Sequence, residues 1–416
     1  MRFAVYHHKL VYDGNKIVVR DLIVLKAGRQ IVGWTDFHKY VRGGGIRSIA
    51  SEKTVAFSQV VQFLNYIFFD KYHVQKLVEV EPHMVKDFAC DYGLHHLVGD
   101  NEQTHRLKST VELCVWNVVH FLEEVIRENA DCKMKVSDFY KKVEQYSKRD
   151  RRYVTKKKLA FDIVYMEDSY ATLRNLPESA FRMIFNRILT HHTNILMLAA
   201  LGSFAGLRPS EACNVRRADS PLGPGLRFEI LDGEVYDIII DLDSEYCLRS
   251  DTVDVGGVKK SRKQRVYVDF IPVFVDCYER YMRYIEGKKY ETAYGPLTTN
   301  RTGKAYTYAS YLAEFHQVVE ECIPDMLDSD DPELVNYGHK LMENRISPHI
   351  FRHWFSCKLA LLGVDAYELM YWRGDKAIES AATYINNKSD LEKQYQKVNN
   401  EVFDYARWLA EKKYGD

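Results

Sequence analysis

The spacing of hydrophobic residues changes twice along the chain. In residues 1–48, short apolar stretches alternate with polar residues and are separated by the turn-forming sequences DGN and AGR, a pattern that predicts short strands. Residues 51–146 instead carry apolar residues three and four positions apart, as in SQVVQFLNYIFF and VELCVWNVVHFLEEVI, which is typical of amphipathic helices. We therefore expect a strand-rich segment at 1–50 and a helical domain at 51–146 that ends with a short helix in VSDFYKKVEQY.

A second domain is expected at 174–416, after a basic linker at 147–173. It begins with two helices in LPESAFRMIFNRILTHHTNILMLAALGSF, and the second is apolar on all sides and therefore buried. The stretches LRFEIL, VYDIIIDL and RVYVDFIP predict a small antiparallel sheet, with DGE as the first turn. Helical spacing returns afterwards and ends in a helix over 390–413. The expected class is mainly α with a small antiparallel β-sheet (α+β).

Composition narrows the class of protein. Hydrophobic residues make up 46% of the 416 residues, enough for two or three domain cores. We find no apolar stretch of the length that crosses a membrane and no pattern of a secretory signal. The eight cysteines include no C-x-x-C pair, which indicates reduced thiols. We expect a cytoplasmic, nucleoid-associated protein that does not contact a membrane.

Basic residues are concentrated in two stretches, although the formal net charge is zero with 58 basic and 58 acidic side chains. Residues 148–158 read KRDRRYVTKKK and residues 259–265 read KKSRKQR. One such stretch is usually a solvated surface, but two of them beside other signals favour contact with a phosphate backbone. The side chains expected to contact DNA are Lys148, Arg149, Arg151, Arg152, Lys156, Lys157, Lys158, Arg262, Lys263 and Arg265.

Two arginine motifs suggest phosphate chemistry. Arg208 precedes Pro209 in GLRPSE, and proline is favoured in the first turn of a helix. An arginine at that place lies beside free backbone N–H groups and the positive end of the helix dipole, where anions bind. His349 and Arg352 form an H-x-x-R motif before an apolar helix in SPHIFRHWFSCKLALLGV.

The order of these motifs resembles a known family. GLRPSE, a basic hairpin, HxxRH and a tyrosine about thirty residues later are similar to the catalytic domain of the tyrosine recombinase (phage integrase) family over about 174–390. Residues 51–146 resemble its core-binding domain more loosely. The resemblance implies these roles: Arg208, His349 and Arg352 bind the phosphate, Lys260 (or Lys259) protonates the leaving group, Tyr384 is the nucleophile, Glu211 braces Arg208, and His353 completes HxxRH.

One position departs from the family pattern. Nine residues before its nucleophile the family usually has Gly-His or Gly-Trp, and this chain has Gly374-Asp375. An ionised carboxylate accepts hydrogen bonds but donates none to a phosphate. Two alternatives remain open for this position. Asp375 holds Arg352 or Arg373 in place, or Trp372 or His353 supplies the missing packing or donor.

The resemblance also implies a reaction and an assembly. Cleavage through a 3′-phosphotyrosyl link, without metal, cofactor or ATP, would conserve the energy of the broken bond for rejoining. The expected partner is double-stranded DNA, bound by a homo-tetramer on paired sites, in integration or excision of a mobile element. The helix over 390–413 would pack on its own domain or on a neighbouring protomer.

Other functions remain possible from the residues alone. Asp237, Asp241 and Asp243 in DIIIDLDSE could hold Mg²⁺ in a metal-dependent nuclease, although solvated acids in a hairpin are the simpler interpretation. Asp375 is consistent with a catalytically impaired DNA-binding relative. A type IB topoisomerase shares the chemistry, but GLRPSE and the helical domain argue against it. A helical protein with a purely structural role is the last alternative. It would require five motif residues to occur in this order by chance, namely Arg208, Lys260, His349, Arg352 and Tyr384.

Overall fold

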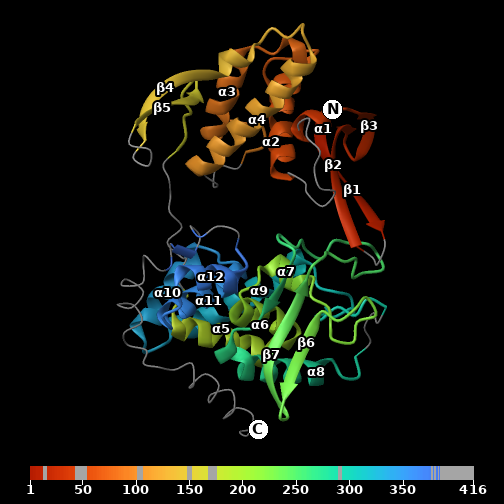
Figure 1. Ribbon diagram of the computed structural model, residues 1–416, viewed down its shortest axis with the longest axis vertical. Helices are drawn as coiled ribbons and strands as arrows, with labels where there is room; N and C mark the ends of the chain where they lie inside the picture. Colours follow the sequence, from red (N-terminus) through yellow and green to blue (C-terminus); the bar gives the residue numbers. More distant parts are fainter. Residues whose placement is uncertain are drawn as a thin grey trace. The chain divides into compact units, whose positions relative to one another are not determined.

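The computed structural model describes residues 1–12, 16–42, 54–100, 106–147, 152–166, 176–288 and 293–375, together with 378, 381, 382 and 384. The chain divides into two units, one of Met1–Leu10 and Val18–Tyr170 and one that includes Ala171–Asp416, and each is described by itself (Figure 1). The helix expected over 390–413 lies outside the described residues.

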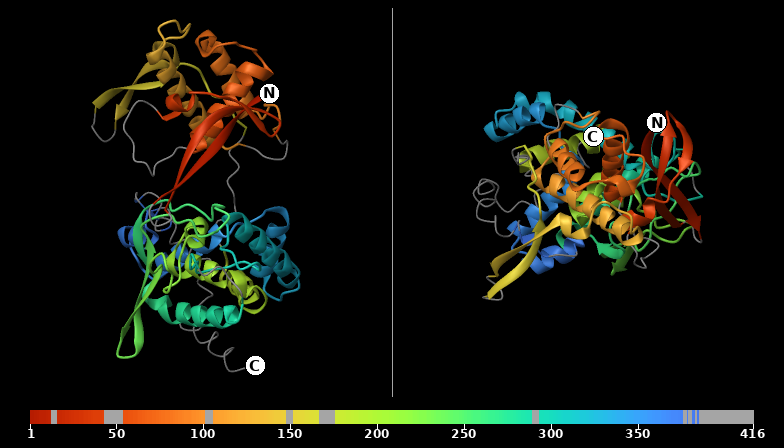
Figure 2. Two further views of the ribbon diagram at one scale, coloured as in Figure 1. Left: turned by 90° about the vertical axis from the view of Figure 1, so that its right-hand side faces the viewer. Right: turned by 90° about the horizontal axis from the view of Figure 1, so that it is seen from above.

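The first unit begins with a three-stranded sheet in the order β1-β2-β3. The strands are β1 (Arg2–Tyr12), β2 (Lys16–Ala27) and β3 (Gln30–Trp34), as the alternating pattern predicted. Strands β2 and β3 are antiparallel and joined at Gly28, whose φ of 57° is readily adopted only by glycine. Figure 2 shows β1 and β2 lying side by side.

Helices with one apolar face form the rest of this unit. They are α1 (His38–Arg42), α2 (Thr54–Asn65), α3 (Pro82–Gly93) and α4 (Lys108–Glu128), with a π-helical turn at Tyr66–Asp70 and 3-10 turns at Leu77–Glu79 and Val136–Phe139. The long α4 buries Val111, Val115, Val118, Leu122 and Val125, which are spaced by three or four residues and therefore share one face. This face packs into the core of the unit.

The short helix expected in VSDFYKKVEQY is wrong. Residues from Tyr140 onward form β4 (Tyr140–Ser147), which pairs antiparallel with β5 (Arg152–Leu159). Part of the stretch expected as a linker is therefore a strand. Tyr140 lies opposite the buried Leu159 and its ring stacks on Trp116 with centroids 6.1 Å apart. These contacts from distant residues override the local helical spacing.

The second unit is built around the apolar helix α6 (Leu196–Ala205), which is buried along its whole length as predicted. Around it lie α5 (Glu178–His191), a 3-10 turn (Thr193–Ile195), α7 (Pro209–Cys213), α8 (Ile271–Ile285), α9 (Tyr308–Leu327), α10 (Pro332–Glu343), α11 (His349–Leu361) and α12 (Ala366–Arg373). Gly202 of α6 allows α11 to come close, because a Cβ there would lie 3.0 Å from Phe351 Cβ. The core of the unit thereby fixes the position of α11.

A three-stranded antiparallel sheet completes this unit, in the order β6-β7-β8. Its strands are β6 (Leu226–Leu231), β7 (Glu234–Leu242) and β8 (Arg262–Arg265). The predicted strand in RVYVDFIP is wrong, because pairing ends at Arg265. Tyr267 N then donates to Phe204 O at 3.0 Å, and Val268–Phe270 forms a 3-10 turn that leads into α8. Ile238 and Ile240 of β7 belong to the core of the unit, while the turn end of the β6–β7 hairpin projects beyond the helices (Figures 1 and 2).

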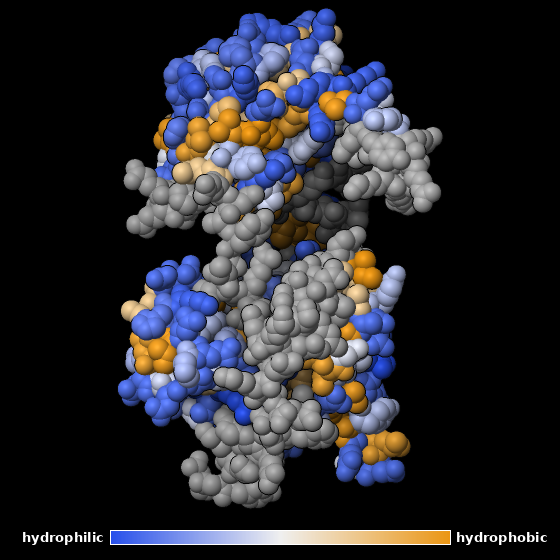
Figure 3. All heavy atoms as spheres, turned by 90° about the vertical axis from the view of Figure 1, so that its left-hand side faces the viewer, coloured by the Kyte–Doolittle hydropathy of each residue, from blue (hydrophilic) through white to orange (hydrophobic). Residues whose placement is uncertain are grey.

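Within the described part of the chain, no single helix has the length and hydropathy to cross a membrane. The segments Glu178–His191 and Thr193–Ala205 pass that test only as a pair bent by 109°, and both belong to the core of the second unit. Figure 3 shows one face of the surface, where hydrophobic patches are surrounded by hydrophilic residues.

Candidate active site

Arg208 is placed by the junction of α6 and α7. Gly206 ends α6 in the left-handed conformation at φ 64°, and Arg208 precedes α7 with Pro209 in its first turn. The Glu211 carboxylate accepts from Arg208 twice, from the backbone N at 3.1 Å and from Nη1 at 3.2 Å. The sequence GLRPSE therefore builds a helix start that orients the guanidinium of Arg208.

Glu211 also binds Arg262 of β8 through two hydrogen bonds, at 3.1 and 2.9 Å. The Glu211 side chain is fully buried. Burial raises its pKa, but the hydrogen bonds from Arg262 and the charge of Arg208 outweigh burial and hold the pKa below its ordinary value. Arg262 was expected to contact DNA, yet its side chain is only 9% exposed. Its two hydrogen bonds to Glu211 connect β8 to α7.

Helix α11 presents His349 and Arg352 three residues apart, so they share one face. The Arg352 side chain is 1% exposed and donates to the carbonyl oxygens of Gly206 and, at 2.8 Å, Arg373. Burial, followed by repulsion from Arg208 and Arg373, lowers the pKa of Arg352 to about 9. Arg352 therefore remains charged at neutral pH.

His349 is mostly buried beside these cations. Burial and then the positive charges of Arg352, Arg208 and Arg373 lower its pKa to about 4. The imidazole is therefore neutral at pH 7, so one ring nitrogen carries a proton and the other is free to accept a hydrogen bond. In that state His349 can serve as a neutral hydrogen-bond donor.

Asp375 is the point where the cationic side chains meet. Its Oδ1 accepts from Arg208 Nη2 and from Arg352 Nη2, both at 2.7 Å. Its Oδ2 forms an ion pair with Arg373 Nε at 2.9 Å. Lys260 Nζ lies 3.5 Å from the backbone oxygen of Asp375. The first of the two alternatives for this position was that Asp375 holds Arg352 or Arg373 in place. In the structure Asp375 contacts both of these arginines.

Tyr384 lies at the edge of the same group of side chains. Its hydroxyl is hydrogen-bonded to Nδ1 of His353, and the guanidinium of Arg373 lies 4.7 Å from its ring centroid. Burial raises the pKa of Tyr384, while the charge of Arg373 acts in the opposite direction. The ring of His353 also contacts that of His349, with centroids 4.9 Å apart. The HxxRH motif thereby connects the tyrosine to the arginines.

We call this set of residues the arginine cluster. It consists of Arg208, Glu211, Lys260, Arg262, His349, Arg352, His353, Arg373, Asp375 and Tyr384. Every residue expected to be catalytic or supporting is among them, and Lys260, rather than its exposed neighbour Lys259, reaches the cluster. Arg373 is the member that sequence reasoning assigned no role of its own. The only indication of Arg373 in the sequence was its position two residues before Asp375. In the structure it is the last residue of α12.

The remaining residues expected to contact DNA lie elsewhere. Lys263 is exposed on β8, and Arg265 pairs with Asp237 at 3.2 Å while half exposed. Lys158 is exposed on β5, and Arg152, Lys156 and Lys157 belong to the same strand. Lys148, Arg149 and Arg151 lie outside the described residues.

The acidic residues considered for a nuclease are engaged in other contacts. Asp237 pairs with Arg265, and Asp241 accepts from the buried Arg216 at 2.9 Å. Asp241 also accepts from the backbone N of Asp243 at 2.9 Å. Among the described residues no group of three or more His, Cys, Asp or Glu is arranged to hold a metal ion. The geometry therefore does not favour the nuclease interpretation.

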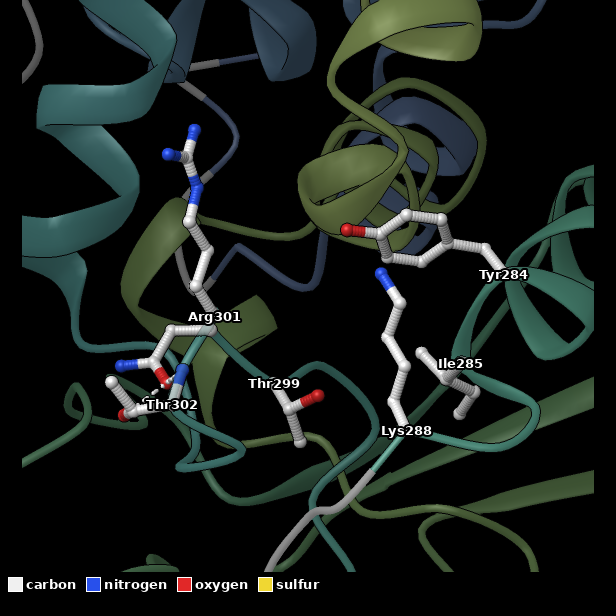
Figure 4. A pocket seen from close by; sticks show the side chains of 7 residues that line it. Tyr284, Ile285, Lys288, Thr299, Arg301 and Thr302 are labelled. Atoms are coloured by element: carbon white, nitrogen blue, oxygen red, sulfur yellow. Dashed lines mark hydrogen bonds between the residues drawn. The ribbon is translucent and has the colours of Figure 1, made fainter.

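A separate cavity of about 390 Å³ lies at the end of α8. Figure 4 shows its lining, in which the ammonium of Lys288 lies 3.3 Å from the ring centroid of Tyr284 and the long side chain of Arg301 extends away. None of its lining residues belongs to the arginine cluster. The charged side chains that converge in this unit therefore lie in the arginine cluster and not around this cavity.

Comparisons with known proteins found likeness in structure. No family model and no curated protein matches the sequence. A Tn1549 transposon integrase variant in complex with transposon right end DNA superposes with a TM-score of 0.50 at 14% identity, over 87% of this chain and 98% of that chain. The same integrase with a circular intermediate DNA gives 0.50 at 14% identity, over 80% and 90%. The XerH site-specific recombinase bound to its difH substrate gives 0.45 at 12% identity, over 83% and 79%. At these identities the likeness concerns the fold, and this chain has the fold of the tyrosine recombinases.

Proposed function

We propose that this protein is a site-specific DNA recombinase that cleaves and rejoins DNA through a 3′-phosphotyrosyl intermediate, without metal or ATP. The observation that carries the proposal is the convergence of Arg208, Arg352 and Lys260 beside Tyr384. These residues come from four separate parts of the sequence, and each has the type that this reaction needs. The fold agrees with the proposal, because the solved structures that resemble this chain include an integrase with DNA.

The charge of the cluster favours an anionic substrate. Four guanidinium groups, those of Arg208, Arg262, Arg352 and Arg373, share two carboxylates, those of Glu211 and Asp375. Lys260 adds a further positive charge beside them. The excess of positive charge is partly shielded from water, where its attraction for a phosphate is strengthened. Arginines also match the bidentate geometry of phosphate oxygens.

In the proposed reaction the Tyr384 oxygen attacks the phosphorus of a DNA phosphodiester. The hydroxyl proton passes to Nδ1 of His353, which is already hydrogen-bonded to it. The new bond joins the tyrosine to the 3′-phosphate, and the bond from phosphorus to the 5′-oxygen breaks. Arg208 and Arg352, with neutral His349 as a donor, stabilise the charge that develops on the phosphoryl oxygens.

Lys260 would donate the proton that the leaving 5′-oxygen requires. Its ammonium lies 3.5 Å from the backbone oxygen of Asp375, next to the arginines that would bind the phosphate. The released 5′-hydroxyl of another strand then attacks the phosphotyrosyl link, and the same groups act in reverse. The phosphodiester energy is conserved in the covalent intermediate, so strand exchange needs no nucleotide cofactor.

The partner in this proposal is double-stranded DNA, with four protomers acting on two paired sites. Exposed Lys141 and Lys158 lie opposite each other on the β4–β5 hairpin of the first unit. Like charges at directly opposed positions destabilise a hairpin, and a bound polyanion would relieve this repulsion. We place the activity in integration or excision of a mobile element, by analogy with the transposon integrase that shares the fold.

A covalent trap tests the proposal. The full chain is mixed in EDTA with DNA from the ends of its own genetic element, nicked next to the presumed cleavage position, and resolved on a denaturing gel. We expect a protein–DNA adduct that is lost in Tyr384→Phe and kept in the matched control Tyr367→Phe, whose side chain is exposed. An adduct that persists in Tyr384→Phe would contradict the assignment of the nucleophile.

The second candidate is a relative that binds DNA sites without cleaving them. It is favoured by one observation, the carboxylate of Asp375 at the centre of the arginines. Specific binding of the same DNA, with no adduct from the wild-type chain on the nicked substrate, would support this candidate over the recombinase.

A further inference from the structure

The carboxylate of Asp375 occupies the position that suits a phosphate oxygen. Two guanidinium nitrogens, Arg208 Nη2 and Arg352 Nη2, point at one oxygen of Asp375 from 2.7 Å each. Arg373 Nε reaches the other oxygen at 2.9 Å. Guanidinium groups bind phosphate oxygens through charge-assisted hydrogen bonds of the kind that Arg208 and Arg352 make here, and Arg373 adds an ion pair. Here the anion belongs to the protein itself.

Burial of these arginines makes a counter-charge beside them necessary. The side chains of Arg352 and Arg373 are 1% and 7% exposed, and that of Asp375 is 7% exposed. Buried cations without a counter-charge are strongly destabilising. The repulsion is visible in the pKa of Arg352, which burial and the charges of Arg208 and Arg373 both lower. A carboxylate among them restores the balance.

A phosphate and this carboxylate cannot occupy the same position. Both are anions, and the two arginine nitrogens that bind Asp375 Oδ1 are those that would bind the phosphate. An ionised carboxylate has no proton with which to bridge to a phosphate oxygen. One anion must therefore leave before the other binds in the same geometry.

The backbone around Asp375 allows such an exchange without rearranging the core. Gly374, at φ 62°, ends α12 in the left-handed conformation, and its backbone packs against the side chain of Arg262. Arg373 and Gly374 are thus held in place, and Asp375 is the first residue beyond them. Rotation of the Asp375 side chain removes the carboxylate and leaves all three arginines in position.

We propose that Asp375 is an intramolecular ligand that closes the phosphate site of the DNA-free protein, and that substrate phosphate displaces it from Arg208, Arg352 and Arg373. The inference rests on the proposed function and adds to it a means of regulation. The arginines are kept ordered but neutralised until a phosphate with further contacts to the protein competes for them. Arg373 becomes a third arginine for that phosphate when the carboxylate leaves.

Anion binding by the full chain tests this inference without DNA. The probe is orthovanadate, and its effect is measured as the shift of the thermal unfolding midpoint with increasing concentration. We expect Asp375→Asn to be stabilised at a vanadate concentration at least about ten times lower than the wild type requires, a difference of about 1.4 kcal/mol in binding free energy. The matched control is Asp241→Asn, which removes a carboxylate from the buried Arg216 outside the cluster and should respond as the wild type does.

A second variant keeps the test valid if Asp375→Asn does not fold. Asp375→His places a hydrogen-bond donor at this position, and circular dichroism establishes which of the two variants folds. An equal response of wild type and either folded variant to vanadate would overturn the inference, as would a stronger response in the wild type. Adding Arg352→Ala to Asp375→Asn should abolish the gain, and a gain that persists would place vanadate elsewhere and also overturn it.

The outcome is separable from that of the proposed function. A vanadate response confined to the Asp375 variants, in a chain that forms no covalent DNA adduct, would leave the closed anion site standing and remove the recombinase proposal. An adduct formed by the wild type, with no difference in vanadate binding among the variants, would do the reverse.

Discussion

The guanidinium of Arg373 lies 4.7 Å from the ring centroid of Tyr384 and pairs at 2.9 Å with Asp375. One side chain thus connects the proposed nucleophile to the anion site. Burial raises the pKa of Tyr384, and the charge of Arg373 opposes that rise. In the proposed reaction, Arg373 would therefore favour the attacking phenolate of Tyr384 as well as bind the phosphate.

Replacing Arg373 by leucine should slow covalent adduct formation. We expect a loss of about 10²-fold, the size typical of removing one preorganised donor from a charged transition state. The pH at which the cleavage rate rises should also shift upward, because the tyrosine loses a neighbouring positive charge. Rates of adduct formation across a pH series measure both effects.

Two variants serve as controls for that change. Arg373→Lys keeps the charge and should restore part of the rate and the pH profile. Arg301→Leu removes an arginine whose side chain is 77% exposed outside the cluster and should leave both unchanged. A profile for Arg373→Leu that falls in amplitude without moving along the pH axis would contradict the proposed effect on Tyr384.

Glu211→Gln should destabilise the second unit. Glu211 is fully buried and shared by Arg208 and Arg262, and breaking one side of a buried charge pair costs about 3 kcal/mol or more. The exposed pair of Glu320 and Arg345, 3.9 Å apart, offers a control, because Glu320→Gln should change stability by under about 1 kcal/mol. Urea unfolding at pH 7 gives both free energies.

The difference in stability between wild type and Glu211→Gln should also depend on pH. The pKa of Glu211 is lower in the folded protein than its ordinary value of 4.5. Its ionised form therefore stabilises the fold fully above pH 4.5, and this contribution is lost as the pH falls through the lower, folded-state pKa. The gap in unfolding free energy between wild type and Glu211→Gln should narrow below pH 4.5. A gap that widens on acidification would contradict this assignment.

His349 should titrate near pH 4 in the folded chain, because burial and then the charges of Arg352, Arg208 and Arg373 lower its pKa. In the unfolded chain it titrates near its ordinary value of 6.5. The unfolded state therefore binds more protons between those values, and stability conferred by neutral His349 is lost as the pH falls from 6.5 towards 4. Histidine ring signals in NMR spectra, assigned with His349→Gln, give the pKa directly. A value above 6.5 would contradict the charge balance described for the cluster.

The sequence predicts those parts of the site that depend on near neighbours. Arg208 and Glu211 are three residues apart at a helix start, and His349 and Arg352 are one turn apart on α11, so local spacing alone brings each pair together. The order of the motifs then indicates that the pairs meet. The buried apolar α6 is predicted equally well, because nothing but a core position suits its composition.

Features that depend on distant residues are not visible in the sequence. Strand β4 needs its partner β5, which lies within the basic stretch that locally resembles a linker. Strand β8 carries RKQR, whose lack of apolar residues hides a strand that is fixed by pairing with β7. Arg373 has no motif, and it is identified only when α12 places it between Asp375 and Tyr384. Arg262 looks like a surface cation until Glu211 is found buried against it.

Gly374→Ala should disturb the cluster more than its backbone conformation alone explains. At φ 62° an alanine is strained by about 1–2 kcal/mol, and its Cβ would also overlap with Nε of Arg262. Arg262 must then move and weaken its two hydrogen bonds to Glu211.

Gly363→Ala is the matched control, because Gly363 has φ 91° but no atom lies within 4 Å of the place that an alanine Cβ would take. Thermal unfolding should show a larger loss for Gly374→Ala than for Gly363→Ala, and adduct formation should fall only in the former. Equal losses of stability in the two variants would mean that the contact with Arg262 contributes nothing and that strain at the end of α12 accounts for the whole effect.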